Sequence, residues 1–226
     1  QPWPGGCHTD RRHLVSCPGW RRDGQPSTLD PIPPMHDILI IGGGFAGVWS
    51  ALGAAAARRE LGAHDSSLRI ALLTREPYLT IRPRLYESNP QDARVPLREL
   101  LDSAGVELIL GDAARIDAAA RTVVARTVPG LATLRYDRLI VAAGSRLRPP
   151  RVPGADSHVF NVDTYAEAMV LESHLRGLAD RPARPGRFTA VVVGAGFAGL
   201  EVATTMVSRL ESISSRVAGG RPSVVL

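Results

Sequence analysis

From residue 35 onward the chain places short apolar runs between polar and glycine-rich stretches. The runs at residues 38–41 and 190–193 are apolar throughout, which is typical of strands buried on both faces of a parallel sheet. An alanine-rich stretch follows each run and predicts a helix, over about 45–61 and to about 209. Alternating strands and helices indicate an α/β fold. Further strands are predicted at 69–73, 106–110, 139–143 and 224–226, a hairpin at 115–128, and helices at 97–103 and 165–178.

A glycine-rich turn joins each apolar run to its helix, with the pattern G-x-G-x-x-G both times. In such a turn the first glycine allows a tight bend, the second lets the backbone approach a pyrophosphate, and the third lets the helix pack on the strand. The helix N-terminus adds free N–H groups and partial positive charge for the phosphates. Two matches, each between a strand and a helix, predict two dinucleotide sites. Their glycines are Gly42, Gly44 and Gly47 in the first turn and Gly194, Gly196 and Gly199 in the second.

These patterns predict an α/β chain with two Rossmann-like dinucleotide-binding domains, at 35–155 and 156–226. The second domain is expected to be incomplete. A dinucleotide half-domain needs at least three strands, whereas residues 224–226 are only the next parallel strand after 190–193. We therefore expect the chain to be a fragment of a longer protein.

Residues 1–34 differ in composition from the rest, with seven prolines and four glycines and no apolar periodicity. Such a segment cannot bury enough surface to offset the entropy of ordering it, so a disordered leader is predicted. Met35 directly precedes the first strand and is expected to be the natural start. Cys7 and Cys17 lie in this leader with His8 and His13 between them, but their spacing fits no common zinc site. No metal is predicted.

Charge and composition narrow the function classes. All 27 basic residues are arginine, and they are scattered along the chain rather than gathered on one face. This argues against nucleic-acid binding, and we interpret it as compositional bias. The absence of lysine excludes Schiff-base chemistry and a Walker-type phosphate lysine. The sequence shows no long apolar run and no secretory signal, which predicts a cytoplasmic protein.

Three further segments carry a resemblance to a known family. Residues 136–145, YDRLIVAAGS, resemble the segment Y-D-x-L-V-x-A-x-G-S of the FAD/NAD(P)-dependent pyridine nucleotide-disulfide oxidoreductases. Residues 152–154, VPG, resemble the I-P-G link that follows it, and residues 76–86 resemble the segment that passes near the flavin ring. Within this superfamily the likeness is greatest to the type II NADH:quinone oxidoreductases, and it covers about 36–226.

The resemblance implies that the first turn binds FAD and the second NAD(P)H. Thr74 stands where a Rossmann site usually has an acid for the ribose, so Glu76 or the Thr74 hydroxyl is expected to serve instead. Arg82 is expected to face flavin or phosphate charge, or solvent. Glu201 either contacts the nucleotide or is a first-turn acid favoured by the helix dipole. The implied FAD residues are Gly42, Gly44, Phe45, Ala46, Gly47, Thr74, Arg75, Glu76, Arg82, Ala143 and Gly144, and the implied NAD(P) residues are Gly194, Gly196, Phe197, Ala198, Gly199 and Glu201.

Cysteine usage separates the branches of the superfamily. Disulfide reductases use a redox-active C-x4-C pair, whereas no cysteine follows Cys17 here. This also argues against the sulfide:quinone branch, which relies on cysteines. The resemblance then implies hydride transfer from NAD(P)H to FAD, with no side-chain nucleophile, and electron transfer to a quinone. A quinone partner would fit peripheral attachment to the cytoplasmic face of the inner membrane. Two alternatives remain: a reductase of a small redox protein of the ferredoxin or rubredoxin type, and a non-catalytic fragment.

Overall fold

The computed structural model describes residues 35–65, 67–148 and 152–226. The predicted leader and its two cysteines lie outside these residues, and so does part of the proline-rich link before the predicted second domain.

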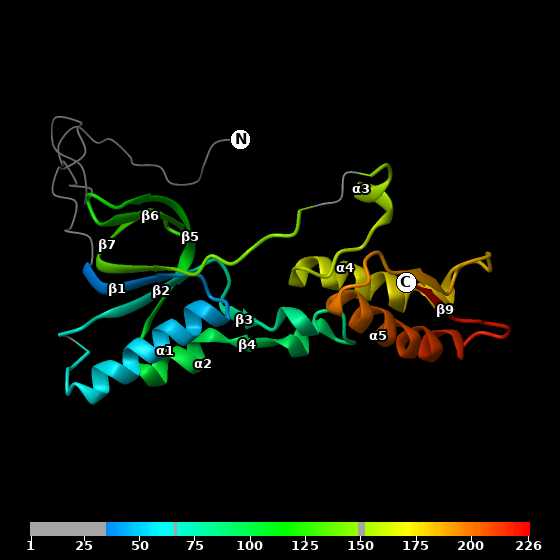
Figure 1. Cartoon of the computed structure of the whole chain (residues 1–226), viewed down its shortest axis with the longest axis horizontal. Helices are drawn as coiled ribbons and strands as arrows, with labels where there is room; N and C mark the ends of the chain where they lie inside the picture. The colour runs from blue at the N-terminus through cyan, green and yellow to red at the C-terminus, as the bar shows by residue number, and fades with distance from the viewer. Residues whose placement is uncertain (1–34, 66, 149–151) are drawn as a thin grey trace, which may run out of the picture. The chain divides into compact units, whose positions relative to one another are not determined.

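Five of the described strands close into a barrel in the order β1-β2-β5-β6-β7 (Figure 1). β1 pairs in parallel with β2 and β7, and β2 pairs in parallel with β5. β5, β6 and β7 form an antiparallel meander. The predicted strand at 106–110 and the first part of the predicted hairpin are one long strand, because β5 continues through both. The bounds are β1 Met35–Ile41, β2 Ile70–Thr74, β5 Glu107–Asp117, β6 Thr122–Thr127 and β7 Gly130–Val141.

The apolar run of β1 is continuous because this strand is buried on both faces, as the sequence predicted. Leu39 and Ile41 pack inside the barrel with Val123 and Leu134. Ile40 lies on the opposite face, in the core beneath the helices. All five residues of β2 are buried in the same way. Alternate side chains of one strand therefore stabilise two different cores.

Helix α1 (Phe45–Glu60) covers the outer face of this sheet through small side chains. Val48, Ala51 and Ala55 are buried against the sheet. The short helix α2 (Leu97–Leu101) adds Leu97 and Leu101 to the same core. A small antiparallel pair, β3 (Tyr78–Thr80) and β4 (Arg94–Pro96), precedes α2. The predicted helices at 45–61 and 97–103 are confirmed to within a few residues.

The buried guanidinium of Arg58 links the end of α1 to neighbouring backbone. Arg58 is 2% exposed and forms an ion pair of 2.8 Å with Asp65. Its guanidinium also donates to the carbonyl oxygens of Leu68 at 3.1 Å, Ala104 at 2.8 Å and Gly105 at 3.2 Å. The loop after α1 and the turn after α2 are thus tied to one side chain, which makes Arg58 a strong determinant of stability.

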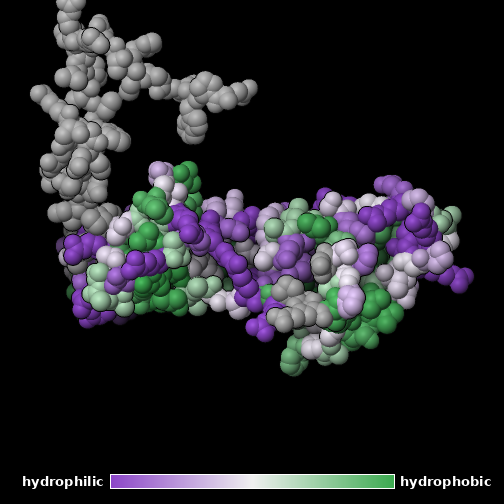
Figure 2. All heavy atoms as spheres, turned by 90° about the horizontal axis from the view of Figure 1, so that it is seen from above, coloured by the Kyte–Doolittle hydropathy of each residue, from purple (hydrophilic) through white to green (hydrophobic). Residues whose placement is uncertain are grey.

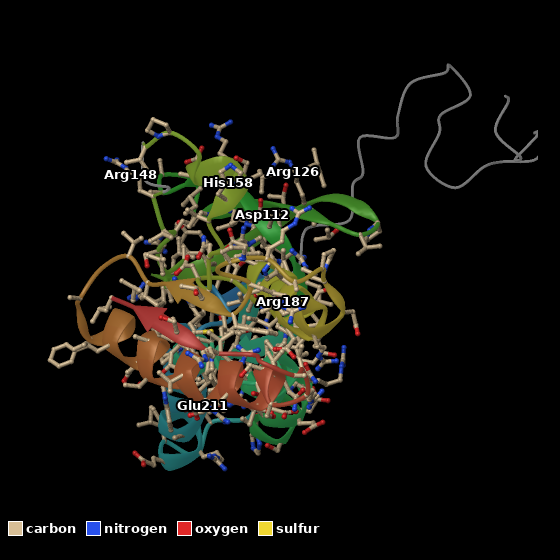
Figure 3. All side chains as sticks on the ribbon, turned by 90° about the vertical axis from the view of Figure 1, so that its right-hand side faces the viewer. Asp112, Arg126, Arg148, His158, Arg187 and Glu211 are labelled. Carbon is tan, nitrogen blue, oxygen red and sulfur yellow. The ribbon has the colours of Figure 1, made fainter. Side chains whose placement is uncertain are left out.

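The outer wall of the barrel carries an exposed pair of opposite charges. Asp112 on β5 and Arg126 on β6 are directly opposed in the register, with 3.9 Å between carboxylate and guanidinium (Figure 3). Both side chains are exposed, so this pair adds little free energy.

The chain after β7 forms a smaller helix–sheet layer. Thr164 caps α4, and its hydroxyl oxygen accepts the N–H of Glu167 at 3.4 Å. β8 and β9 pair in parallel, as predicted for the last residues of the chain. Their core contains Leu175, Phe188, Met206 and Leu210. The elements are α3 Ala155–His158, α4 Tyr165–Arg176, β8 Thr189–Val191, α5 Phe197–Ser214 and β9 Ser223–Val225.

Two predicted strand ends are less buried than expected. β7 ends at Val141, which is 60% exposed, and β8 ends at Val191, which is 68% exposed. Val193, beyond β8, is 88% exposed. The strand predicted at 139–143 therefore ends two residues early, and the predicted burial of the run at 190–193 is wrong, because the carboxyl ends of β7 and β8 are left uncovered. Figure 2 shows hydrophobic side chains at the surface over both the barrel and the layer that follows it.

Candidate functional site

The first glycine turn joins β1 to α1 and is closed by backbone contacts at two of its glycines. Gly42 has φ +114°, and a Cβ there would lie 2.1 Å from the Ala142 carbonyl oxygen. A Cβ on Gly47 would lie 1.8 Å from the Gly42 carbonyl oxygen. Neither position has room for any side chain. The amide N–H of Gly42 donates to Leu73 at 2.8 Å, which fixes the turn against β2.

The middle glycine of this turn faces open space. A Cβ on Gly44 would meet no protein atom within 4 Å. Gly44 is the N-cap of α1, no side chain caps the helix, and its first turn carries no acid. The first N–H groups of α1 are therefore free of an intrahelical partner and point to an uncovered position. Phe45 and Ala46, the next two residues, are exposed beside it. This is the geometry that lets a phosphate approach the backbone.

The second turn, between β8 and α5, repeats the first closely. Gly194 has φ +112°, and a Cβ on Gly199 would lie 1.7 Å from the Gly194 carbonyl oxygen. The N-caps match as well, with φ −81° and ψ −177° at Gly44 and φ −76° and ψ 176° at Gly196. Gly196, like Gly44, has no atom within 4 Å of its Cβ position. The turns differ at the first glycine, because no atom lies within 4 Å of a Cβ on Gly194. Phe197 and Ala198 are exposed after it.

Thr74 lies against the first turn, whereas the acid two residues later is paired with an arginine. A Cβ on Gly43 would lie 2.6 Å from the Thr74 hydroxyl oxygen, so the two residues are in contact. Glu76 instead forms an ion pair of 2.9 Å with Arg94. The Arg94 guanidinium also lies over the rings of Tyr78 and Tyr165, at 3.9 Å and 4.1 Å from their centres. Of the two groups expected to serve the ribose, the structure places the threonine nearer the turn.

Arg82 binds protein groups around the chain that leaves β7. It forms an ion pair with Asp163 and donates to the carbonyl oxygen of Ser145 at 3.2 Å. Asp163 also accepts the amide N–H of Leu147 at 3.1 Å. Arg82 thus holds the segment that follows Ala143 and Gly144, two exposed small residues at the carboxyl end of β7. No local pattern in the sequence indicated Asp163, which lies far from Arg82 along the chain.

Glu201, on the second turn of α5, accepts a hydrogen bond from the Tyr86 hydroxyl at 3.1 Å. Burial, followed by this hydrogen bond to Glu201, raises the pKa of Tyr86 above its ordinary value. The phenol therefore stays protonated and keeps donating at neutral pH. Tyr86 belongs to the segment that sequence comparison placed near the flavin. Its pairing with Glu201 brings a residue of that segment next to a predicted residue of the second site.

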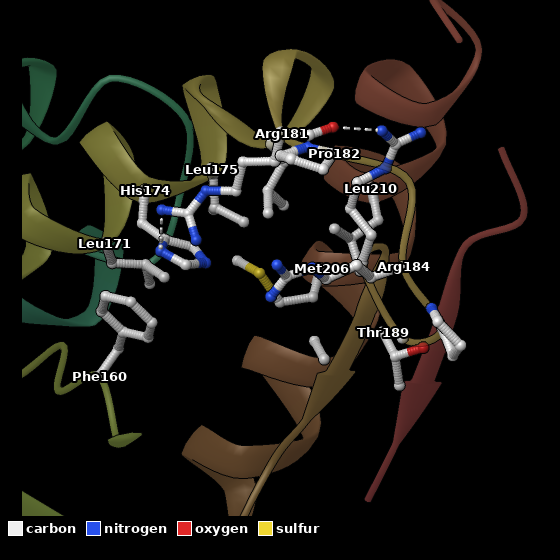
Figure 4. A pocket seen from close by; sticks show the side chains of 15 residues that line it. Phe160, Leu171, His174, Leu175, Arg181, Pro182, Arg184, Thr189, Met206 and Leu210 are labelled. Atoms are coloured by element: carbon white, nitrogen blue, oxygen red, sulfur yellow. Dashed lines mark hydrogen bonds between the residues drawn. The ribbon is translucent and has the colours of Figure 1, made fainter. Parts of the chain in front are cut away.

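A groove of about 620 Å³ lies apart from both turns, between α4, α5 and the loop before β8 (Figure 4). Leucines and Met206 line it, with His174 and Arg181 facing each other on one side. Arg181 donates to His174 Nδ1 at 3.1 Å, so this ring nitrogen carries no proton. Burial, and then the charge of Arg181, lower the pKa of His174.

The lowered pKa of His174 predicts that the folded chain loses stability in acid. An unfolded histidine takes up its proton near pH 6.5, whereas folded His174 does so only at lower pH. Acidification through this window therefore favours the unfolded chain. We expect the free energy of unfolding to fall less between pH 7 and pH 5 in His174→Gln than in the parent chain, as measured by urea titration. An equal fall in the free energy of unfolding between pH 7 and pH 5 in both proteins would contradict the lowered pKa of His174.

Among the described residues, no group of three histidine, cysteine, aspartate or glutamate side chains is placed to hold a metal ion. None of the described helices has the length and hydropathy needed to cross a bilayer.

Comparison with known proteins places this geometry in a family. Residues 36–217 match the family model of the pyridine nucleotide-disulphide oxidoreductases. The chain belongs to this family. The match includes both glycine turns and all but the first residue of the barrel, and it confirms the resemblance and the fold class inferred from the sequence.

Two relatives come from Mycobacterium tuberculosis. An NADH dehydrogenase-like protein is 40% identical over 192 residues, which is 85% of this chain and 47% of the relative. The type II NADH:quinone oxidoreductase NdhA is 29% identical over 201 residues, which is 83% of this chain and 40% of the relative. The chain thus spans about half the length, or less, of the curated relatives it matches.

A solved structure shows the same fold. The sulfide:quinone oxidoreductase of Aquifex aeolicus superposes with a TM-score of 0.59 and 25% identity, over 78% of this chain and 40% of that one. This neighbour and the chain share the fold over the matched residues.

Proposed function

We propose that this chain provides the two nucleotide sites of a flavoprotein NADH dehydrogenase, which passes electrons from NADH through FAD to a quinone. The observation that carries the proposal is the repeated turn. In each turn, backbone packs against the third glycine and the second glycine faces open space. The N-terminus of a helix, with no side-chain cap, adjoins that space. A pyrophosphate needs this combination of space, N–H donors and positive dipole.

In the first site Gly42 and Gly47 set the shape of the turn, and Gly44 leaves the room through which FAD phosphates would reach the α1 N–H groups. Thr74 is the nearest hydroxyl from β2 and is proposed to bind the ribose. Ala143 and Gly144, small and exposed, would let the flavin approach the end of β7. Arg75 and Glu76 are also proposed to line this site, with Glu76 steadied by Arg94. Arg82 would position the neighbouring backbone rather than contact the cofactor, because Asp163 already binds it.

In the second site Gly194, Gly196 and Gly199 would receive the pyrophosphate of NADH, with Phe197 and Ala198 beside it on α5. Glu201 lies one turn further along the helix, held by Tyr86. When bound, FAD supplies the redox chemistry by accepting a hydride and releasing electrons to an acceptor. The protein groups bind and orient the two nucleotides. The quinone acceptor is proposed from the relatives described as NADH:quinone oxidoreductases.

The test is to titrate the purified full-length protein with FAD, then to add NADH without oxygen, and to follow the flavin absorbance. We expect FAD to bind and NADH to bleach it. Menadione, as a soluble quinone, is expected to restore the colour faster than a ferredoxin at equal concentration. Faster reoxidation by the ferredoxin would favour the reductase of a small redox protein. Absence of FAD binding would contradict the proposed function of this chain.

A further inference from the structure

Tyr86 contacts helix α5 twice, through different groups. Its hydroxyl donates to Glu201 Oε2 at 3.1 Å, and its backbone carbonyl oxygen accepts a hydrogen bond of 2.8 Å from Arg209 Nη1. Glu201 and Arg209 lie on the same helix, about two turns apart. One residue therefore holds α5 at two separate levels.

The contact between Arg209 and the Tyr86 carbonyl oxygen is supported by a buried ion-pair network. Arg209 and Glu172 are both buried and form an ion pair between α5 and α4. Glu172 also binds Arg176 at 2.6 Å, and Arg176 donates to Asn89 at 2.9 Å. Because a buried carboxylate needs its partners, this network resists displacement. The Tyr86 carbonyl is thus docked onto a fixed group.

The contact between the Tyr86 hydroxyl and Glu201 is close to the second glycine turn. Helix α5 begins at Phe197, directly after its N-cap Gly196, and Glu201 lies on the next turn of the helix. Tyr86 itself follows Arg82, which is tied to the chain leaving β7 through Ser145 and Asp163. A short segment thus connects the end of β7, beside the first turn, to the start of α5, beside the second.

We propose that Tyr86 is a positioning residue that holds Glu201 and the start of α5, and so fixes the second glycine turn in place for its nucleotide. The identity of that nucleotide rests on the proposed function. The contacts of Tyr86 with Glu201 and Arg209, called the clamp below, do not depend on it. The phenol hydroxyl is the decisive group, because Arg209 binds the backbone and is unaffected by the side chain.

The test compares hydrogen exchange of backbone amides in α5 between the parent chain and Tyr86→Phe. The variant keeps the ring and the Arg209 contact and loses only the donor to Glu201. We expect amides of residues 201–206 to exchange about fivefold faster, the effect of losing roughly one net hydrogen bond. Tyr165→Phe is the matched control, because it removes a hydroxyl from a tyrosine that packs on Arg94, and it should leave α5 unchanged.

Substitutions at Glu201 separate a specific contact from general loosening. Glu201→Gln keeps an acceptor oxygen for the Tyr86 hydroxyl, so exchange should stay near that of the parent. Glu201→Leu removes the acceptor and should reproduce Tyr86→Phe, and the double variant should be no faster than either single one. Additive effects, or parent-like exchange in Tyr86→Phe, would overturn the clamp.

A second measurement asks whether the clamp serves the nucleotide. Calorimetric titration of the same proteins with NADH should give a Kd about fivefold higher for Tyr86→Phe and unchanged for Tyr165→Phe. Faster exchange with an unchanged Kd would overturn the positioning role, since the contact would then be structural only. If the parent chain binds no NADH, the proposed function fails, and hydrogen exchange alone then supports or overturns the clamp.

Discussion

Gly44→Val is expected to abolish FAD binding without unfolding the protein. The valine side chain meets no protein atom within 4 Å of its Cβ, so the fold has room for it. The same space is where a pyrophosphate has to approach the N-terminus of α1. Flavin content after reconstitution, measured by absorbance, should fall to background, whereas the thermal unfolding midpoint should stay close to that of the parent chain.

Two other glycines provide matched controls. Gly53, also on α1, has no atom within 4 Å of its Cβ position, and Gly53→Val should therefore retain flavin. Gly47→Ala should lose both flavin and fold, because its Cβ would lie 1.8 Å from the Gly42 carbonyl oxygen. Full flavin content in a folded Gly44→Val protein would refute the assignment of the first turn as a phosphate site.

Arg58→Met is expected to lower the free energy of unfolding by about 3 kcal/mol, the range for breaking a buried ion pair. Methionine fills much of the same volume but leaves Asp65 and three carbonyl oxygens without their donor. Because Asp65 is largely exposed and regains water, the loss should lie at the lower end of that range. Urea titration followed by circular dichroism measures the change.

The neighbouring arginine serves as the control for charge and helix propensity. Arg59 lies beside Arg58 in the last turn of α1, and its side chain is exposed. Arg59→Met should change the free energy of unfolding by no more than about 0.5 kcal/mol. Similar losses in both variants would mean that the buried network around Arg58 contributes nothing specific.

Local patterns predicted the parts of the fold that local physics determines. The two turns follow from glycine spacing, because a tight bend and close packing exclude side chains at fixed positions. Helices α1 and α5 and the strands before them were found from apolar runs. The barrel was not predicted, because its closure depends on which distant strands pair. β5 looked like two elements in sequence, since its alternation changes where it leaves the parallel pairing with β2 and joins the meander.

The glycine spacing predicted the shape of the two turns, whereas the sequence did not predict the partners of the charged side chains near them. Gly44 and Gly196 lie in the open positions that their motifs required. Arg82 was expected to face flavin or phosphate charge, or solvent, and Glu76 was one of two groups expected to serve the ribose. In the structure Arg82 forms an ion pair with Asp163, and Glu76 forms one with Arg94. Their partners, Asp163 and Arg94, carry no local signal, because an ion pair between distant residues leaves no periodicity in the sequence. The Tyr86–Glu201 contact was missed for the same reason.

The packing of β7 against the first turn has a consequence for how the protein folds. Gly42 is held by backbone from Ala142, which is made about a hundred residues later. A ribosome that has released β1, β2 and α1 has therefore not yet produced a complete first turn. Contacts this distant in sequence are slow to form, since a long loop has to close before they stabilise anything. The nucleotide site encoded first is thus expected to mature only after the meander has closed the barrel.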